Sequence, residues 1–241
     1  MQRVELTNRQ VLNMITYINK GLAMAGVGGH IISFENSKDK IYKIDKDFIK
    51  QYVENVWIVS TKERKARENV IKELHGLQRY FNEIEFPYGL IYFDGVYAGN
   101  IQKFYYDYTT LRSCLTDKSL TDYDKLYVLN YILALIKKFE EHQITYADLH
   151  PSNIMIKRNS IKLIDFDDEE HVHVFKPTYC FESYKGYLNL LREFTERGTD
   201  LRDELTEYIY EEQPGKFNKD IFSKEVCQDY LDKYKKTLKL K

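Results

Sequence analysis

The stretch "YADLHPSNIMI", residues 146–156, places an aspartate and an asparagine close together beside apolar segments. A second stretch, "IKLIDFDD", residues 161–168, is an apolar run that ends at Asp165. Short apolar runs bounded by polar turns are typical of buried strands. The order therefore predicts a loop that carries Asp148 and Asn153, then two short strands joined by a polar turn, with Asp165 at the end of the second strand.

The composition is that of a folded chain without a strong electrostatic bias. The 241 residues suffice for one large domain or two small lobes, and 43% of them are hydrophobic, which excludes a disordered polymer. The formal net charge of -1 gives no field that attracts nucleic acid, so we expect no nucleic-acid partner. The cysteines Cys114, Cys180 and Cys227 are far apart and form no CxxC, so neither a disulfide framework nor a zinc site is predicted.

The chain shows no sign of a targeting or membrane segment. Its start, "MQRVELTNRQ", lacks the apolar core of a secretory signal. It contains no run of about 18 apolar residues of the kind that crosses a bilayer. We therefore expect a cytoplasmic protein without a membrane span.

The first half of the chain alternates helical and strand-like patterns. Apolar periodicity and turn residues predict, in chain order, a helix over 6–25 capped by Thr7 or Asn8, a hairpin of 31–34 and 41–44, a charged amphipathic helix over 61–81, and two strands around Asp94-Gly95. The second half is richer in helix. A helix over 122–142 follows a capping box formed by Thr121 and Asp124, and from about Ser183 the pattern is helical to the end.

These patterns predict an α+β fold of two lobes. Residues 1–103 form a small β-rich N-lobe, residues 104–108 a hinge, and residues 109–241 a reduced, mostly helical C-lobe.

The polar residues of the two opening stretches fit the chemistry of a magnesium–nucleotide site. Carboxylate and amide oxygens are hard ligands that suit Mg²⁺, so Asn153 and Asp165 could hold the metal on a nucleotide. Asp148 could lie near without ligating and accept a hydroxyl proton. Lys43, in the strand-like "IYKI", is the candidate cation for the phosphates. Taken singly, each aspartate is more often a cap or turn residue; the ordered set favours the site.

"YADLHPSNIMI…KLIDFDD" resembles the catalytic and metal-binding segments of the protein-kinase-like superfamily. This superfamily includes protein kinases, compact atypical kinases, lipopolysaccharide-core kinases, and aminoglycoside and choline kinases. The resemblance implies that Asp148 orients the acceptor hydroxyl and takes its proton, and that Asn153 and Asp165 bind Mg²⁺. It also implies that Lys43 grips the α- and β-phosphates of ATP.

The resemblance implies further contacts to ATP in the first lobe. A glutamate on the helix after Lys43 should pair with that lysine; Glu73 is the first choice and Glu68 the alternative. Phe104 and Tyr106 in the hinge would offer backbone groups to adenine. The phosphate loop would be formed around Gly28 and Gly29, although the stretch "GLAMAGVGGHIISF" is a poor match to the family's glycine pattern, and the glycines could equally end a helix and start a strand.

Several residues depart from the protein-kinase pattern. Ala147 stands where the family carries an arginine, so we expect activity without activation-loop phosphorylation. His150, where Ser/Thr kinases have lysine, could donate to the γ-phosphate or hold the loop. Asp167 adds a second aspartate after Asp165, as in aminoglycoside-kinase-like enzymes, and is a candidate accessory metal ligand.

Three functions follow from the resemblance. The short interval from Phe104 to Asp148 favours a compact kinase that phosphorylates a hydroxyl, with Ser/Thr of a protein preferred as acceptor. The D-L-H and D-F-D motifs, and the absence of an A-P-E segment after Asp165, suit a small-molecule or sugar kinase instead. A nucleotide-binding pseudokinase scaffold is the third hypothesis. It is disfavoured by the retention of Lys43, Asp148, Asn153 and Asp165.

Overall fold

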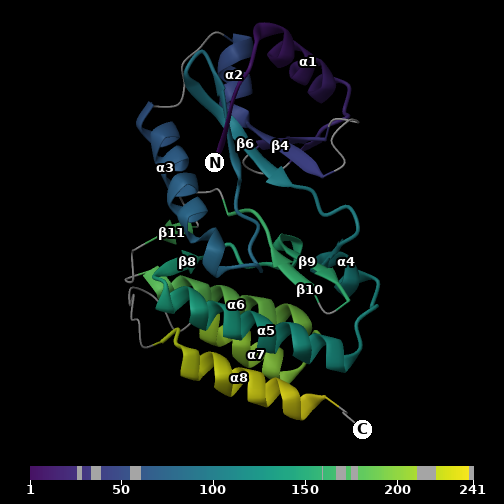
Figure 1. Cartoon of the computed structure of the whole chain (residues 1–241). Helices are drawn as coiled ribbons and strands as arrows, with labels where there is room; N and C mark the ends of the chain where they lie inside the picture. The colour runs from purple at the N-terminus through teal and green to yellow at the C-terminus, as the bar shows by residue number, and fades with distance from the viewer. Residues whose placement is uncertain are drawn as a thin grey trace. The chain divides into compact units, whose positions relative to one another are not determined.

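The computed structural model describes residues 1–25, 29–33, 39–54, 61–158, 160–166, 172–174, 179–210 and 221–238. The chain divides into two compact units, Met1–Tyr108 with Ile164–Glu169, and Thr109–Leu163 with Glu170–Lys241 (Figure 1). Helices and sheets occur in both, which confirms the α+β class. The first unit ends at the last residue of the predicted hinge. It also includes the segment from Ile164, which the sequence reading assigned to the C-lobe.

The first unit is built on one sheet of six strands, in the order β1-β5-β6-β4-β3-β2. Strands β1 and β5 pair in parallel and the other neighbours pair antiparallel. The elements of this unit, in chain order, are β1 (Gln2–Glu5), α1 (Asn8–Asn19), β2 (Met24–Ala25), β3 (Gly29–Ile32), β4 (Lys40–Asp45), α2 (Lys46–Glu54), α3 (Thr61–Leu77), η1 (Gln78–Tyr80), β5 (Gly89–Phe93) and β6 (Val96–Lys103).

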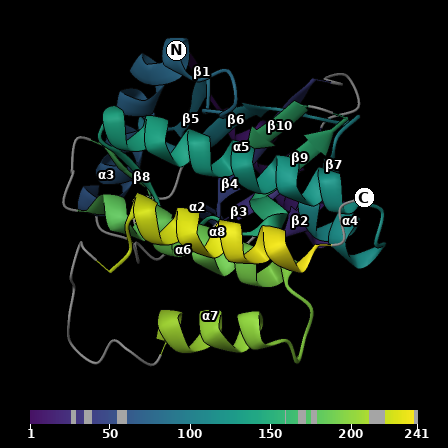
Figure 2. The same cartoon turned by 90° about the horizontal axis from the view of Figure 1, so that it is seen from below.

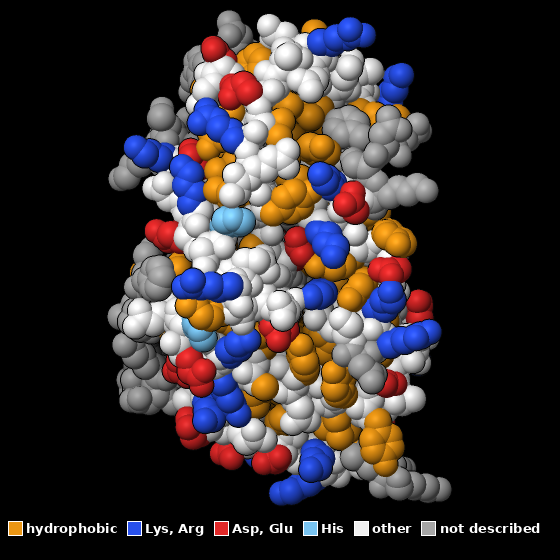
Figure 3. All heavy atoms as spheres, viewed as in Figure 1, with side chains coloured by type: hydrophobic (Ala, Val, Ile, Leu, Met, Phe, Trp, Pro, Cys, Tyr) orange, Lys and Arg blue, Asp and Glu red, His pale blue; other side chains and the backbone are white. Residues whose placement is uncertain are grey.

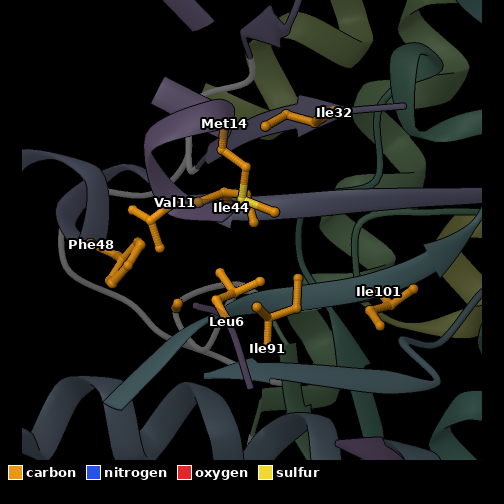
Figure 4. Close-up of a cluster of buried hydrophobic side chains, with 9 residues drawn as sticks. Leu6, Val11, Met14, Ile32, Ile44, Phe48, Ile91 and Ile101 are labelled. Atoms are coloured by element: carbon orange, nitrogen blue, oxygen red, sulfur yellow. The ribbon is translucent and has the colours of Figure 1, made fainter. Parts of the chain in front are cut away.

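Helix α1 covers one side of this sheet through a continuous apolar core. Val11 and Met14 of α1 and Phe48 of α2 meet side chains of β3, β4, β5 and β6, and all of them are at most 5% exposed (Figure 4). The helix starts where it was predicted to, because Thr7 accepts from the Gln10 backbone N–H and the Gln10 side chain accepts from that of Thr7. The apolar face of α1 therefore orders the part of the sheet that carries β4.

Helix α3 is fixed to the sheet by apolar and polar contacts. Ile71 packs in a buried cluster with Leu90, Tyr92 and Tyr97. Asp45, at the end of β4, accepts hydrogen bonds from the backbone N–H groups of residues 47 and 48, and so caps α2. Its second carboxylate oxygen pairs with Arg67 of α3. One buried carboxylate thus joins β4, α2 and α3.

The structure corrects three sequence predictions in this unit. The first helix ends at Asn19 rather than near Ala25, because Gly21 adopts a φ of 69° that breaks it, and β2 follows. Strand β1 and helix α2 were not predicted. The hairpin of β3 and β4 and the turn at Asp94-Gly95 are confirmed, and both turn residues have positive φ, as tight hairpin turns require.

The second unit contains two small sheets and a group of helices. Its elements are β7 (Thr109–Thr110), α4 (Leu111–Thr116), α5 (Asp122–Glu141), β8 (Ile144–Tyr146), η2 (Pro151–Asn153), β9 (Ile154–Lys157), β10 (Ser160–Leu163), β11 (Val172–Val174), α6 (Cys180–Phe194), α7 (Asp200–Tyr210) and α8 (Lys224–Thr237). Strands β10, β9 and β7 form one sheet, and β11 and β8 form the other. Helix α4 and strands β7 and β11 were not predicted.

Helix α6 is the centre of the helical group, where it contacts α5, α7 and α8 (Figure 2). Helix α5 begins at the predicted capping box, since Thr121 accepts from the Asp124 backbone N–H and the Asp124 carboxylate accepts from that of Thr121. Its predicted inward residues Leu126, Leu129 and Leu133 are all buried.

Two features of the described residues concern the surroundings of the protein. Within the described ranges, no helix is both long and apolar enough to cross a bilayer. On the face shown in Figure 3, basic and acidic side chains are interspersed, in keeping with the formal net charge of -1.

Candidate active site

In the second unit, the loop after β8 holds Asp148 and Asn153 together. The Asn153 side-chain amide donates to the Asp148 carboxylate at 2.8 Å and to its backbone carbonyl at 3.1 Å. The turn is closed by the Asn153 backbone N–H, which donates to the His150 carbonyl at 3.0 Å. Asn153 is 6% exposed, whereas the Asp148 side chain is 34% exposed. The loop thus presents one carboxylate to solvent and fixes it with a buried amide.

The hydrogen bonds of Asn153 leave its amide oxygen as an available ligand. Both bonds to Asp148 use the amide nitrogen, and among the residues that the structure describes Oδ1 accepts none. An amide oxygen is a hard donor of the kind that Mg²⁺ accepts as a ligand. Asn153 therefore fits the predicted metal.

His150 faces the same carboxylate. Its Nδ1 accepts from the Ser152 backbone N–H at 3.2 Å, so a neutral ring carries its proton on Nε2. Nε2 lies 3.5 Å from Asp148 Oδ1, which is longer than a hydrogen bond. The structure thus places His150 beside Asp148, and its predicted roles, donation to the γ-phosphate or support of the loop, stay predictions.

Helix α6 positions this loop through contacts with its backbone. Ser183, which is buried, accepts a hydrogen bond from the Tyr146 backbone N–H at 2.8 Å. Three residues further along α6, a Cβ on Gly186 would lie 3.0 Å from Leu149 Cβ and 3.4 Å from the Ala147 carbonyl. A larger residue there would push against the backbone on both sides of Asp148. The glycine therefore permits the close approach of helix and loop.

In the first unit, Lys43 forms an ion pair with Asp165. Lys43 is on β4 and its side chain is 14% exposed; Asp165 is 39% exposed. Asp165 has a φ of 70°, an uncommon conformation for a residue with a side chain, and such strain is frequent at functional sites. The next residue, Phe166, is buried and packs edge-on against Phe86 at 5.5 Å between ring centroids.

Gly99 of β6 allows β4 to carry Lys43 at this place. It pairs with Ile44 and has a φ of 155°, and a Cβ there would lie 2.2 Å from the Lys43 carbonyl oxygen. No side chain fits at that distance. The position of the Lys43 backbone thus depends on a glycine in the neighbouring strand.

The β9–β10 hairpin relates the metal-ligand candidates along the chain. Ile154 pairs with Leu163 at one end of the hairpin. Asn153 comes directly before Ile154, and Asp165 follows Leu163 by two positions. Along the sequence, the two candidates thus flank the β9–β10 hairpin.

For the remaining predicted residues of the first unit, the structure gives a position but does not test the predicted role. Glu73 is exposed on α3. Glu68 accepts hydrogen bonds from Lys72 and from the Tyr92 hydroxyl; burial opposes its ionisation, but these bonds outweigh it and lower its pKa. The pairing of Lys43 with a glutamate of α3 stays a prediction.

Phe104 and Tyr106 follow β6, and Tyr106 is 73% exposed. Gly29 is the first residue of β3, where it pairs with Asp45. Gly28 and Asp167 lie outside the described residues. Of the described residues, no three His, Cys, Asp or Glu side chains form a metal-ligating group, and the predicted set includes an amide in place of a third carboxylate.

No model of a known protein family matches the chain, and no curated protein matches it. The assignment of a function therefore depends on the residues and their geometry.

Sequence reasoning missed the residues that support the site from a distance. Ser183, Gly186 and Gly99 act through contacts whose partners are far away along the chain. The glycines interrupt an amphipathic helix and an apolar strand, and an isolated glycine in such a pattern is the signal that points to a close approach.

Proposed function

We propose that this protein is an ATP- and Mg²⁺-dependent phosphotransferase with a bilobal, protein-kinase-like fold. The single observation that carries the proposal is the Asp148–Asn153 pair at the end of the β9–β10 hairpin from which the chain continues to Asp165. In this proposal Asp148 is the exposed proton acceptor, and the Asn153 amide oxygen and the Asp165 carboxylate are the metal ligands. The Lys43–Asp165 ion pair adds a cation suited to phosphate.

In the proposed reaction, the acceptor hydroxyl attacks the γ-phosphorus of ATP. A bond forms between the hydroxyl oxygen and phosphorus, the bond to the β–γ bridging oxygen breaks, and ADP leaves. Asp148 orients the hydroxyl and takes its proton. Lys43 binds the α- and β-phosphates, and Asn153 and Asp165 hold the metal. Bound Mg²⁺ supplies positive charge against the phosphate oxygens.

The preferred acceptor is Ser or Thr of a protein. The interval between the linking segment and Asp148 contains the short helix α4 and the single long helix α5, in keeping with a compact kinase. A small-molecule hydroxyl is the second candidate. It is favoured by the early start of α6 at Cys180, which leaves only a short segment after Phe166 in which to build a peptide-docking platform.

The test uses ATP labelled on its γ-phosphate. The purified chain is incubated with label and Mg²⁺ alone, with a protein extract, or with a deproteinised metabolite pool, and each mixture is repeated with Asp148→Ala. Label in protein supports the preferred acceptor, and label only in the metabolite pool rejects it for the second candidate. ATP binding without transfer to any pool would contradict catalysis and favour a scaffold.

A further inference from the structure

The segment after β6 is held by one side chain from a distant loop. Glu85 precedes β5, and its Oε1 accepts from the Lys103 backbone N–H at 3.2 Å. Its other oxygen accepts from the Tyr105 hydroxyl. Burial and the hydrogen bond to Glu85 raise the pKa of Tyr105, so the phenol keeps its proton and remains a donor. A single carboxylate thus fixes a backbone position and a side chain two residues apart.

Two backbone hydrogen bonds complete the conformation of this segment. The Phe104 N–H donates to the Asp39 carbonyl at 2.9 Å, and the Tyr108 N–H donates to the Tyr105 carbonyl at 3.1 Å. The rings of Tyr105 and Tyr108 pack edge-on, with centroids 5.0 Å apart. The segment is therefore a fixed turn, held at its start by Glu85 and closed by Tyr108.

These bonds decide which backbone groups are left for a ligand. The Phe104 N–H is occupied by Asp39, but its carbonyl accepts no hydrogen bond within the described ranges. Likewise, among the described residues the N–H groups of Tyr105 and Tyr106 donate to nothing. The edge of adenine offers one amine donor and one ring-nitrogen acceptor, which require a carbonyl and an N–H side by side.

We propose that Glu85 and Tyr105 are positioning residues for recognition of the nucleotide base. They hold residues 104–106 so that the Phe104 carbonyl and the Tyr106 N–H are presented to adenine. A loop that must keep such groups unpaired cannot be fixed by its own backbone ladder, so side chains from elsewhere must hold it. This inference rests on the proposed function, since it names the part of the first unit that would read the base of ATP.

The test separates base recognition from phosphate recognition. Affinities for Mg-ATP and for magnesium tripolyphosphate, which has no base, are measured by calorimetry in the wild type, Tyr105→Phe and Glu85→Gln. Tyr123→Phe, at a tyrosine that is 62% exposed in the second unit, is the matched control. We expect the Tyr105 and Glu85 variants to bind Mg-ATP about tenfold more weakly, the size of one charge-assisted hydrogen bond, with unchanged affinity for tripolyphosphate.

Amide hydrogen exchange provides a second measurement. Exchange of the Lys103 N–H should be slow in the wild type and accelerate in Glu85→Ala.

Three results would overturn the inference. These are unchanged ATP affinity in Tyr105→Phe and Glu85→Gln, equal loss of affinity for both ligands, and a wild type that binds tripolyphosphate as tightly as ATP. A wild type that binds neither ligand would contradict the proposed function itself. If the wild type binds Mg-ATP but not tripolyphosphate, the affinities of Tyr105→Phe and Tyr123→Phe for Mg-ATP are compared. Weaker binding by Tyr105→Phe supports the inference, and equal binding overturns it.

Discussion

The two groups of candidate residues are held by opposite kinds of structure. Asp148 and Asn153 are 5 residues apart, and one loop makes every hydrogen bond between them. Lys43 and Asp165 are 122 residues apart and meet because the segment after β10 lies against β4. The first pair is neutral–anionic and fixed locally, and the second is an ion pair fixed by the fold of the whole unit.

The two groups therefore depend on different supporting contacts. The Asp148 loop depends on the contact of α6 with its backbone, at Gly186 and Ser183. Lys43 depends on the approach of β6 to β4 at Gly99. Damage to one support should therefore impair one step of the reaction rather than both.

The largest effect is expected from Asp148→Ala. Loss of the proton acceptor should lower the rate of phosphoryl transfer about 10²- to 10⁴-fold while Mg-ATP binding changes little. Single-turnover kinetics and calorimetry measure the two quantities. Asp117→Ala, at an exposed aspartate of the same unit, is the control and should retain activity. Full turnover in Asp148→Ala would remove this residue from the mechanism.

Substitution of the two supporting glycines should affect the two groups differently. Gly99→Ala would place a Cβ 2.2 Å from the Lys43 carbonyl in a strained conformation, and we expect a loss of about 2–4 kcal/mol of stability together with weaker ATP binding. Gly186→Ala meets Leu149 Cβ at 3.0 Å, which should cost about 1–3 kcal/mol and reduce transfer more than binding. Urea unfolding and steady-state kinetics test both, and the opposite assignment of the two effects would contradict the comparison.

The buried carboxylate at the end of β4 should matter more than ion pairs on the surface. Asp45→Asn keeps an oxygen that can cap α2 but loses the ion pair with Arg67, and we expect a loss of about 1.5–3 kcal/mol. Arg67→Met should not add its full effect in the double variant. Lys233→Met breaks an ion pair whose two side chains are each 47% exposed, and should cost less than about 1 kcal/mol. Equal losses in urea unfolding would refute the ranking.

The smallest effect is a dependence of stability on pH through Glu68. Its pKa is lowered in the folded protein from the usual 4.5, so its contribution to stability is complete above that pH and is lost as the pH falls through the folded value. Glu68→Gln should therefore flatten the fall in thermal midpoint below pH 4.5, and an unchanged profile would contradict this.

The sequence predicted the local features well and the distant ones poorly. The Thr121 capping box, the hairpin turn at Asp94 and the Asp148 loop each depend on residues within a few positions of one another. Helix α2 was missed although Asp45 is an ordinary N-cap, because its apolar pattern is short. Strand register, which no local pattern specifies, decides the distant contacts. These are the ion pair of Lys43, the close approach of Gly99 and the hydrogen bond between Tyr105 and Glu85.

The most direct test of the central claim is whether Mg²⁺-dependent ATP binding requires Asp165. Calorimetry of the wild type and Asp165→Asn with ATP, each with Mg²⁺ and with EDTA, measures it. We expect Mg²⁺ to strengthen ATP binding in the wild type and this gain to be absent in the variant. An equal gain in both proteins, or no binding of ATP to the wild type, would contradict the assignment of this chain as a phosphotransferase that holds its metal through Asp165.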